Sequence, residues 1–293
     1  MSPPSLTTVN QAIGQEIGRT SYTYCERDAV LYALGVGAPS DPLDADELKF
    51  VYERSNDFQV LPTFAALFSR DLHSLFLQGE IAGISYNPMI LVHGEQQLYV
   101  MKPLPHAATV DSICTIRDIQ DKGSGLLLVV EISSCDQAGD LLAIARMSLF
   151  MRGMGGFGGE RGTSRKVDLP HRTPDSVHEE PTLTKQALVY RLCGDANPLH
   201  ADPSMAAVGG YDRPILHGLC TYGFAARAII KRFCENDAHR LHSLDVRFSY
   251  HVFPGETLLT EMWQHSPSEV RFRTQVKERD AVVLSHGCAR IKD

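Results

Sequence analysis

The chain has 293 residues, which suits one large domain or two domains of about 150 residues each. Hydrophobic residues make up 43% of it and charged residues 22%, as in ordinary globular proteins. A net charge of −7 and the lack of a long basic run argue against nucleic acid as a partner. No apolar run approaches the roughly 20 residues of a membrane span, so we expect no membrane partner.

The seven cysteines lie at irregular intervals without a C-x-x-C pair. An odd number at such spacing predicts free thiols in a reducing compartment, and it argues against a disulfide framework or a zinc site. The first 25 residues have no uninterrupted apolar core, so we expect no secretory signal.

The first half predicts an α+β unit over residues 1–152. Apolar residues recur at helical spacing at 26–34 and at about 62–76. Strand-like runs then follow at 89–102, 108–119, 125–134 and 141–151.

A Gly- and Pro-rich polar stretch at 153–181 predicts a linker. Its first glycines, Gly153, Gly155 and Gly158, match the G-x-G-x-x-G pattern of dinucleotide-binding loops. Such a loop requires an amphipathic helix directly after it, and residues 160–166 have no apolar period. We therefore interpret this stretch as a linker and not as a cofactor loop.

The second half, 182–293, repeats the order of helix and strands with clearer patterns. Helices are predicted at 183–192, with Thr182 or Thr184 as N-cap, and at 219–233. An alternating strand is predicted at 244–252, and further strands at 257–263, 270–276 and 281–291. The two halves therefore resemble two similar α+β units in tandem, as a duplication would produce.

Three groups that can transfer or orient protons occur within six residues: Asp195, Asn197 and His200. On a continuous helix Asp195 and His200 would point to different faces. Pro198 forces Asn197 out of the helical region, and Gly194 can end the preceding helix, so a tight loop can bring the side chains together. A carboxyl and an imidazole that share one water form a general acid/base pair. The alternative is a turn capped by Asp195 with His200 on a surface loop.

Gly218 opens the predicted 219–233 helix, where backbone N–H groups lack helical partners and lie at the positive end of the dipole. Such donors suit a thioester oxygen that gains negative charge during a reaction. The alternative is a glycine needed only for close packing.

At these residues the chain resembles the (R)-specific 2-enoyl-CoA hydratases, the MaoC-like hydratase 2 group that also forms the hydratase unit of peroxisomal multifunctional enzyme type 2. The matching segments are 190–200, 213–221 and 253–257 in the second half, and 32–38, 91–96 and 121–125 in the first. The resemblance implies a tandem (double) hot-dog fold, in which a curved antiparallel sheet wraps a long helix in each unit. Only the second unit keeps the hydratase motif.

The resemblance also implies roles for single residues. Asp195 and His200 would be the catalytic pair, Asn197 would orient the water or His200, and the Gly218 N–H would bind the thioester oxygen. Tyr190 and Glu53 match positions that support the active site. The matching coenzyme A-binding positions are His93, Gly94, Lys122, Phe248 and the loop Asp195, Ala196, Asn197, Pro198, Leu199 and His200, with Gly218.

From this match we expect reversible hydration of trans-2-enoyl-CoA to (3R)-3-hydroxyacyl-CoA in β-oxidation or a related pathway. No metal or redox cofactor is needed, because coenzyme A belongs to the substrate. A hot-dog acyl-CoA thioesterase is the main alternative, and a non-catalytic acyl-CoA-binding module is a third. Oligomeric state stays open, with a homodimer as one option.

The resemblance implies a peroxisomal location, whereas the last residues, Arg290 to Asp293, form no S-K-L-like signal, as expected for a cytoplasmic protein. The compartment therefore stays open.

Overall fold

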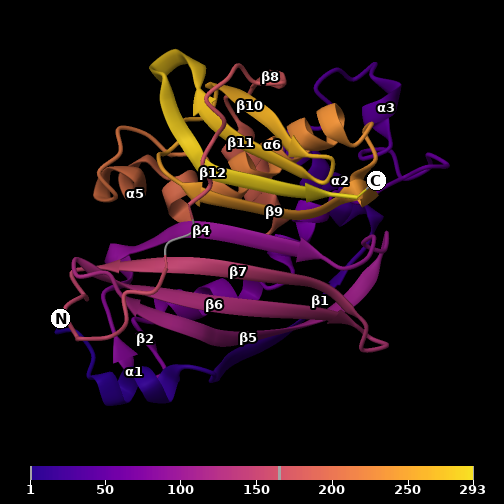
Figure 1. Cartoon of the computed structure of the whole chain (residues 1–293). Coiled ribbons are helices and arrows are strands. Elements are labelled where there is room, and N and C mark those ends of the chain that lie inside the picture. Colours follow the sequence, from indigo (N-terminus) through magenta and orange to yellow (C-terminus); the bar gives the residue numbers. More distant parts are fainter. Residues whose placement is uncertain (1, 164–165, 293) are drawn as a thin grey trace.

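The computed structural model describes residues 2–163 and 166–292. One ten-stranded antiparallel sheet runs through both halves, in the order β1-β5-β6-β7-β4-β9-β12-β11-β10-β8 (Figure 1). The first half supplies β1 (Glu16–Tyr24), β4 (Leu91–Val100), β5 (Ala108–Asp121), β6 (Gly125–Asp136) and β7 (Leu141–Arg152). The second half supplies β8 (Ser176–Pro181), β9 (Leu241–Phe248), β10 (Thr257–Ser266), β11 (Glu269–Val276) and β12 (Ala281–Ile291). A separate hairpin contains β2 (Glu80–Ile81) and β3 (Ile84–Ser85).

Both halves use the same strand order. In each half, the central strand, β4 or β9, is followed in the chain by a three-strand meander that starts beside the outer edge strand and runs back to the central strand. The strand that precedes the helices, β1 or β8, forms the outer edge. At the centre of the sheet the two halves are joined by antiparallel pairing of β4 with β9, from Glu95 opposite Arg247 to Tyr99 opposite Ser243. This repeated order confirms the expected arrangement of two similar α+β units.

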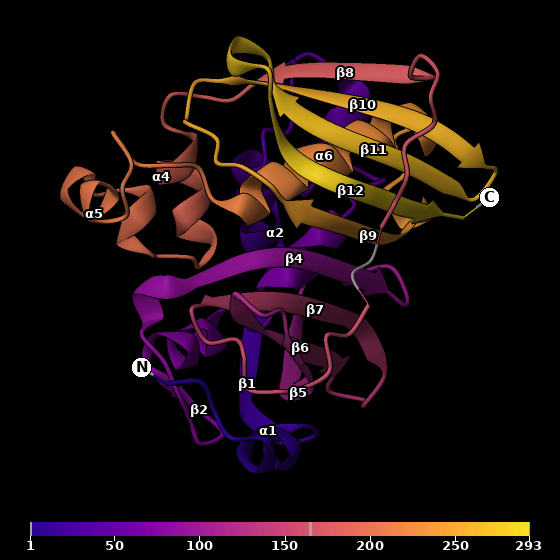
Figure 2. The same cartoon turned by 60° about the vertical axis from the view of Figure 1, so that its left-hand side comes forward.

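The long helix of the second half is α6 (Gly218–Phe233), as predicted. Its residues from Leu219 to Ile230 are all buried, because β9, β10 and β12 contact it on one side and the first half covers the other (Figure 2). The positively charged Lys231 and Arg232 lie in the last turn of α6, where cations stabilise the helix by interacting with its dipole.

The expected helix at 62–76 is wrong in type. Two 3₁₀ helices stand there, η1 (Pro62–Leu67) and η2 (Arg70–Leu77), separated at Ser69. The apolar residues Leu61, Phe64 and Leu67 recur every three positions, a spacing that fits a 3₁₀ helix as well as an α-helix. The first unit therefore has two short 3₁₀ helices at this place, and η1 packs against α6. The second unit has the long helix α6, which packs against its sheet.

The remaining helices are short. They are α1 (Leu6–Ala12), α2 (Glu26–Gly35), α3 (Ala45–Leu48), η3 (Pro88–Ile90), α4 (Gln186–Tyr190), η4 (Arg191–Cys193), η5 (Pro198–His200), α5 (Pro203–Val208), η6 (Ala238–Arg240) and η7 (Lys277–Arg279). The predicted threonine N-cap of the 183–192 helix is wrong: α4 begins after Lys185 without a side-chain cap. The Thr182 hydroxyl instead donates to the Glu256 carbonyl at 2.8 Å, which ties the start of this segment to the second sheet half.

The linker is shorter than 153–181, because its last six residues form β8 and pair with β10. Within the described residues, no helix lies between the Gly-rich stretch and β8. The Asp121 carboxylate accepts backbone N–H groups of Gly156 and Gly158 at 2.9 Å, and this fastens the stretch to the end of β5 as a turn. The expected strand at 244–252 is wrong for its last four residues, since β9 ends at Phe248.

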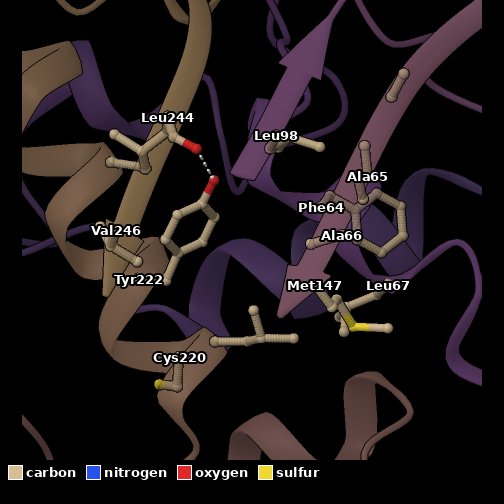
Figure 3. Close-up of a cluster of buried hydrophobic side chains, with 14 of the residues drawn as sticks. Phe64, Ala65, Ala66, Leu67, Leu98, Met147, Cys220, Tyr222, Leu244 and Val246 are labelled. Atoms are coloured by element: carbon tan, nitrogen blue, oxygen red, sulfur yellow. Dashed lines mark hydrogen bonds between the residues drawn. The ribbon is translucent and has the colours of Figure 1, made fainter. Parts of the chain in front are cut away.

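Apolar side chains of both halves meet in one core. Phe64, Ala65, Ala66 and Leu67 of η1 lie near Leu98 of β4 and Met147 of β7, on the side of α6 that carries Cys220 and Tyr222 (Figure 3). The buried Tyr222 hydroxyl donates to the Leu244 carbonyl at 2.7 Å, so its polar atom is satisfied.

Among the described residues no helix is long and apolar enough to cross a membrane.

Candidate active site

The loop from Gly194 to His200 folds as its residues predict. Gly194 ends η4 with a φ of 128°, a conformation that favours glycine. Asn197 adopts an extended ψ of 121° before Pro198, and η5 begins there. Asp195 Oδ1 accepts the Asn197 N–H at 3.1 Å, so the carboxylate is held by its own loop. The bend brings Asp195 back toward His200.

The ring of His200 is buried and held in one orientation. Its Nδ1 lies 2.9 Å from the Ile215 carbonyl oxygen. A carbonyl only accepts hydrogen bonds, so in the neutral ring Nδ1 carries the proton and Nε2 keeps its lone pair. His200 is therefore set up as a base through Nε2.

A second histidine, His217, completes the cluster and was not among the predicted site residues. Its ring stacks on that of His200, with centroids 3.8 Å apart and an interplanar angle of 28°. Its Nε2 donates to the Asp195 carbonyl oxygen at 3.1 Å. His217 therefore contacts both Asp195 and His200, the predicted acid/base pair. The available signal was its place directly before the glycine that opens α6.

The ligand atoms of Asp195, His200 and His217 all lie within 4.8 Å of one another. Three such groups could hold a divalent cation, because imidazole nitrogens and a carboxylate suit several metals. The same spacing lets a carboxyl and an imidazole share one water, as an acid/base pair requires.

Burial sets the protonation of the two imidazoles. It lowers the pKa of His200 from its usual value of 6.5, and the nearby Asp195 carboxylate opposes this shift. Burial lowers the pKa of His217 further, to about 3, and the adjacent His200 adds to the effect. Both rings are neutral at pH 7, which leaves His200 able to accept a proton.

Gly218 opens α6 next to this cluster. His217 occupies the N-cap position, and its side chain makes no capping hydrogen bond to the first N–H groups of the helix. A Cβ at Gly218 would lie 3.1 Å from Phe248 Cε1, so the Phe248 ring lies directly over the glycine. The His93 ring meets Phe248 with a centroid distance of 4.9 Å. Gly94, the next residue, sits where the pairing of β4 with β7 shifts register.

The Tyr190 ring packs against the His217 ring of the cluster. It is buried, and its ring lies 4.8 Å from that of His217 and 6.2 Å from that of Tyr32. Burial, the largest cause, raises its pKa well above 10, so the phenol stays protonated. Among the described residues its hydroxyl has no hydrogen-bond partner, and the same is true of His217 Nδ1.

Glu53 does not join the site. It is exposed in the loop after α3. On either side of it in sequence, Glu47 pairs with Arg227 and Gln59 accepts the Ala238 N–H. These contacts place the loop near the C-terminal half of α6, whereas the acid/base cluster lies at its N-terminus. Among the described contacts none joins Glu53 to the cluster, and its expected supporting role stays a prediction.

Two further predicted residues, Asn197 and Lys122, make contacts that do not test their expected roles. The Asn197 oxygen accepts the Leu199 N–H at 3.0 Å, and within the described residues Asn197 makes no hydrogen bond to the His200 ring. It shapes the loop, in which Ala196, Asn197 and Pro198 are exposed and Leu199 is partly buried. Lys122 stands at the exposed β5–β6 turn, and its Nζ donates to the Arg161 carbonyl at 2.6 Å.

Comparison with known proteins identifies the family. Residues 22–153 match the MFE-2 hydratase 2 N-terminal domain, and residues 165–286 match the MaoC like domain. The chain is 44% identical over 287 residues to "Enoyl-CoA hydratase 2, peroxisomal" of Arabidopsis thaliana, an alignment that covers 93% of this chain and 92% of that protein. The chain belongs to the enoyl-CoA hydratase 2 family.

Solved structures agree with this membership. A MaoC-like dehydratase from Phytophthora capsici has a TM-score of 0.89 at 35% identity, covering 97% of this chain and 98% of that one. A Mycobacterium tuberculosis protein with a double hotdog fold has a TM-score of 0.58 at 14% identity, covering 98% of this chain and 97% of that one, which supports the fold alone. The tandem hot-dog prediction is confirmed. In this hydratase 2 chain the acid/base cluster lies in the MaoC-like half.

Proposed function

We propose that the protein reversibly hydrates trans-2-enoyl-CoA to (3R)-3-hydroxyacyl-CoA, in fatty-acyl β-oxidation or a related acyl-CoA pathway. One observation carries the proposal: a carboxyl and a neutral imidazole lie together beside the uncapped N-terminus of α6. Family members at 40–44% identity over nearly the whole chain are named enoyl-CoA hydratase 2. The two lines of support are independent.

The N-terminus of α6 activates the substrate. The thioester oxygen accepts the Gly218 N–H, and the helix dipole stabilises the negative charge that develops on that oxygen. Withdrawal of electrons toward the oxygen makes C3 of the conjugated enoyl group electrophilic. Phe248 lies over Gly218 and fixes the approach of the thioester.

The acid/base pair then adds water across the double bond. His200 Nε2 takes one proton from water as its oxygen bonds to C3, and the protonated Asp195 delivers a proton to C2. The proton held on His200 returns to Asp195, which restores the starting state. Both groups lie on one side of the loop, so oxygen and hydrogen add to the same face.

We propose that coenzyme A follows the seam between β4 and β9. His93 and Phe248 contact each other there, and Phe248 contacts Gly218. Lys122 lies farther out, on the exposed turn between β5 and β6, where its cation suits the phosphates of the nucleotide.

Crotonyl-CoA distinguishes hydration from the thioesterase alternative. A hydratase removes the enoyl absorbance without releasing free thiol, and chiral analysis of the product shows the (3R) isomer. Thiol release would identify a thioesterase, and an (S) product would contradict the proposed stereochemistry. Binding without turnover would identify the non-catalytic module.

We also propose that catalysis needs no metal or redox cofactor. The acid/base roles above use the His200 lone pair and the Asp195 carboxyl, which a bound cation would occupy. Activity should be unchanged after dialysis against EDTA. Loss of activity on dialysis, with recovery on adding Zn²⁺, would show that the three-residue cluster holds a metal.

A further inference from the structure

Arg70, at the start of η2 in the first unit, contacts the segment that leads into the loop Gly194–His200 of the second unit. This loop, which carries Asp195 and His200, is called the catalytic loop below. Its Nη1 donates to the Cys193 carbonyl oxygen at 3.1 Å and to the Tyr22 hydroxyl at 3.2 Å. Its guanidinium lies over the Tyr22 ring, 4.0 Å from the centroid, in cation–π geometry. One side chain thus joins β1 to the residue two positions before Asp195.

The loop backbone passes directly against this side chain at Gly194. A Cβ built on Gly194 would lie 2.2 Å from Arg70 Cδ, so any larger residue there would displace the Arg70 side chain. The φ of 128° independently favours glycine there. Gly194 and Arg70 therefore fit one another closely at the point where the chain turns toward Asp195.

The segment before the loop is also fixed to the first unit. Gln186 Nε2 donates to the Gly35 carbonyl at 2.7 Å, and the Cys193 thiol contacts the Leu31 carbonyl at 3.6 Å. Both acceptors lie on α2. Arg70 adds a contact at the last residue before the turn, so the first unit holds the loop from two sides.

We infer that Arg70 is a positioning residue for hydration: it holds the Cys193 carbonyl and Gly194, and through them sets the place of the Asp195 carboxyl. The inference rests on the proposed hydratase activity and assigns a role in it to the unit that lacks the motif. Because small displacements of catalytic groups are costly, a side chain outside the acid/base cluster can control the rate.

The test replaces Arg70 and measures steady-state hydration of crotonyl-CoA. Arg70→Met keeps much of the apolar length but removes the donors, and we expect kcat to fall about tenfold or more with KM changed less than about threefold. Arg70→Lys keeps a cation and a donor without the planar fork, so it should recover part of the lost kcat. An unchanged kcat, or a rise in KM alone, would overturn the inference; the second result would make Arg70 a substrate-binding residue.

Two controls separate positioning from general stability. Val130→Ala truncates a buried residue of β6 and should lower the melting temperature while kcat is kept. Arg19→Met removes an exposed arginine that pairs with Glu16 and should change neither quantity. If Arg70→Met does not fold, Tyr22→Phe serves instead, since it removes the second acceptor and should lower kcat severalfold.

Hydrogen exchange gives a readout that needs no activity. In Arg70→Met the amides of 194–200 should exchange faster than in the parent, while those of α6 should not. Equal exchange in the loop would contradict the inference even in an active enzyme. If the parent does not hydrate crotonyl-CoA, the proposed function fails, and the exchange result still decides whether Arg70 holds the loop.

Discussion

The Ile215 carbonyl determines which nitrogen of His200 can act as a base. It accepts from Nδ1, so the lone pair of the neutral ring lies on Nε2. His217 then holds the Asp195 backbone and stacks on His200. Burial keeps both rings neutral. The base is thus defined by hydrogen bonds as well as by residue type.

Asp195→Asn should lower kcat by about 10²- to 10⁴-fold, the usual loss for a general acid or base. The amide keeps the shape of the side chain and cannot deliver the proton to C2. The measurement is the hydration rate of crotonyl-CoA beside a thermal melt. Asp202→Asn is the matched control, because Asp202 caps α5 close by and asparagine is an equally good N-cap, so kcat and melting temperature should both be kept. Near-parental turnover in Asp195→Asn would refute its role.

The pH dependence of kcat/KM should reflect the lowered pKa of His200. A base must be unprotonated, so activity is lost as pH falls through its pKa. Burial lowers that pKa, and the acidic limb should therefore lie below pH 6.5. A limb above pH 6.5 in the parent would contradict a buried, neutral His200.

At the scale of elements, local signals predicted α6 and the acid/base loop correctly. The apolar pattern of α6 extends over 16 residues, which is long enough to predict a buried helix. Gly194 and Pro198 predict a bend because each restricts the backbone locally. The segment 62–76 was harder, because a three-residue apolar spacing suits two kinds of helix. The stacking of His217 on His200 depends on how the loop packs against the start of α6, which local patterns do not show.

Gly218→Ala tests the helix start. In an ordinary helix alanine would be favourable, but here its Cβ would lie 3.1 Å from Phe248 and press the ring out of place. We expect kcat/KM to fall about tenfold or more, since the thioester can no longer reach the N–H in the same position. Fold and melting temperature should change little. Partial recovery in Gly218→Ala with Phe248→Leu would show that the ring mediates the loss, whereas full activity in Gly218→Ala would argue against this site for the thioester.

At the scale of the whole molecule, the sequence predicted two units but not how firmly they are joined. The β4–β9 seam makes one sheet of both, and Arg227 in the middle of α6 is buried against Glu47 of the first unit and Glu180 of the second. These contacts have no local sequence signal, because Arg227 lies 180 residues from Glu47 and 47 residues from Glu180. The two units therefore share one sheet and one buried ion-pair network.

Separating the units should abolish activity. A chain ending at Gly162 exposes the β4 edge, and the remaining C-terminal half exposes β9 and leaves the Arg227 guanidinium without Glu47. Losing one partner of a buried ion pair typically costs about 3–5 kcal/mol, much of the stability of a domain. Each half purified alone should be inactive on crotonyl-CoA, and coexpression should restore turnover by reforming the seam. If the C-terminal half alone turned over at the parental rate, the first unit would be dispensable for both the fold and the positioning of the catalytic loop.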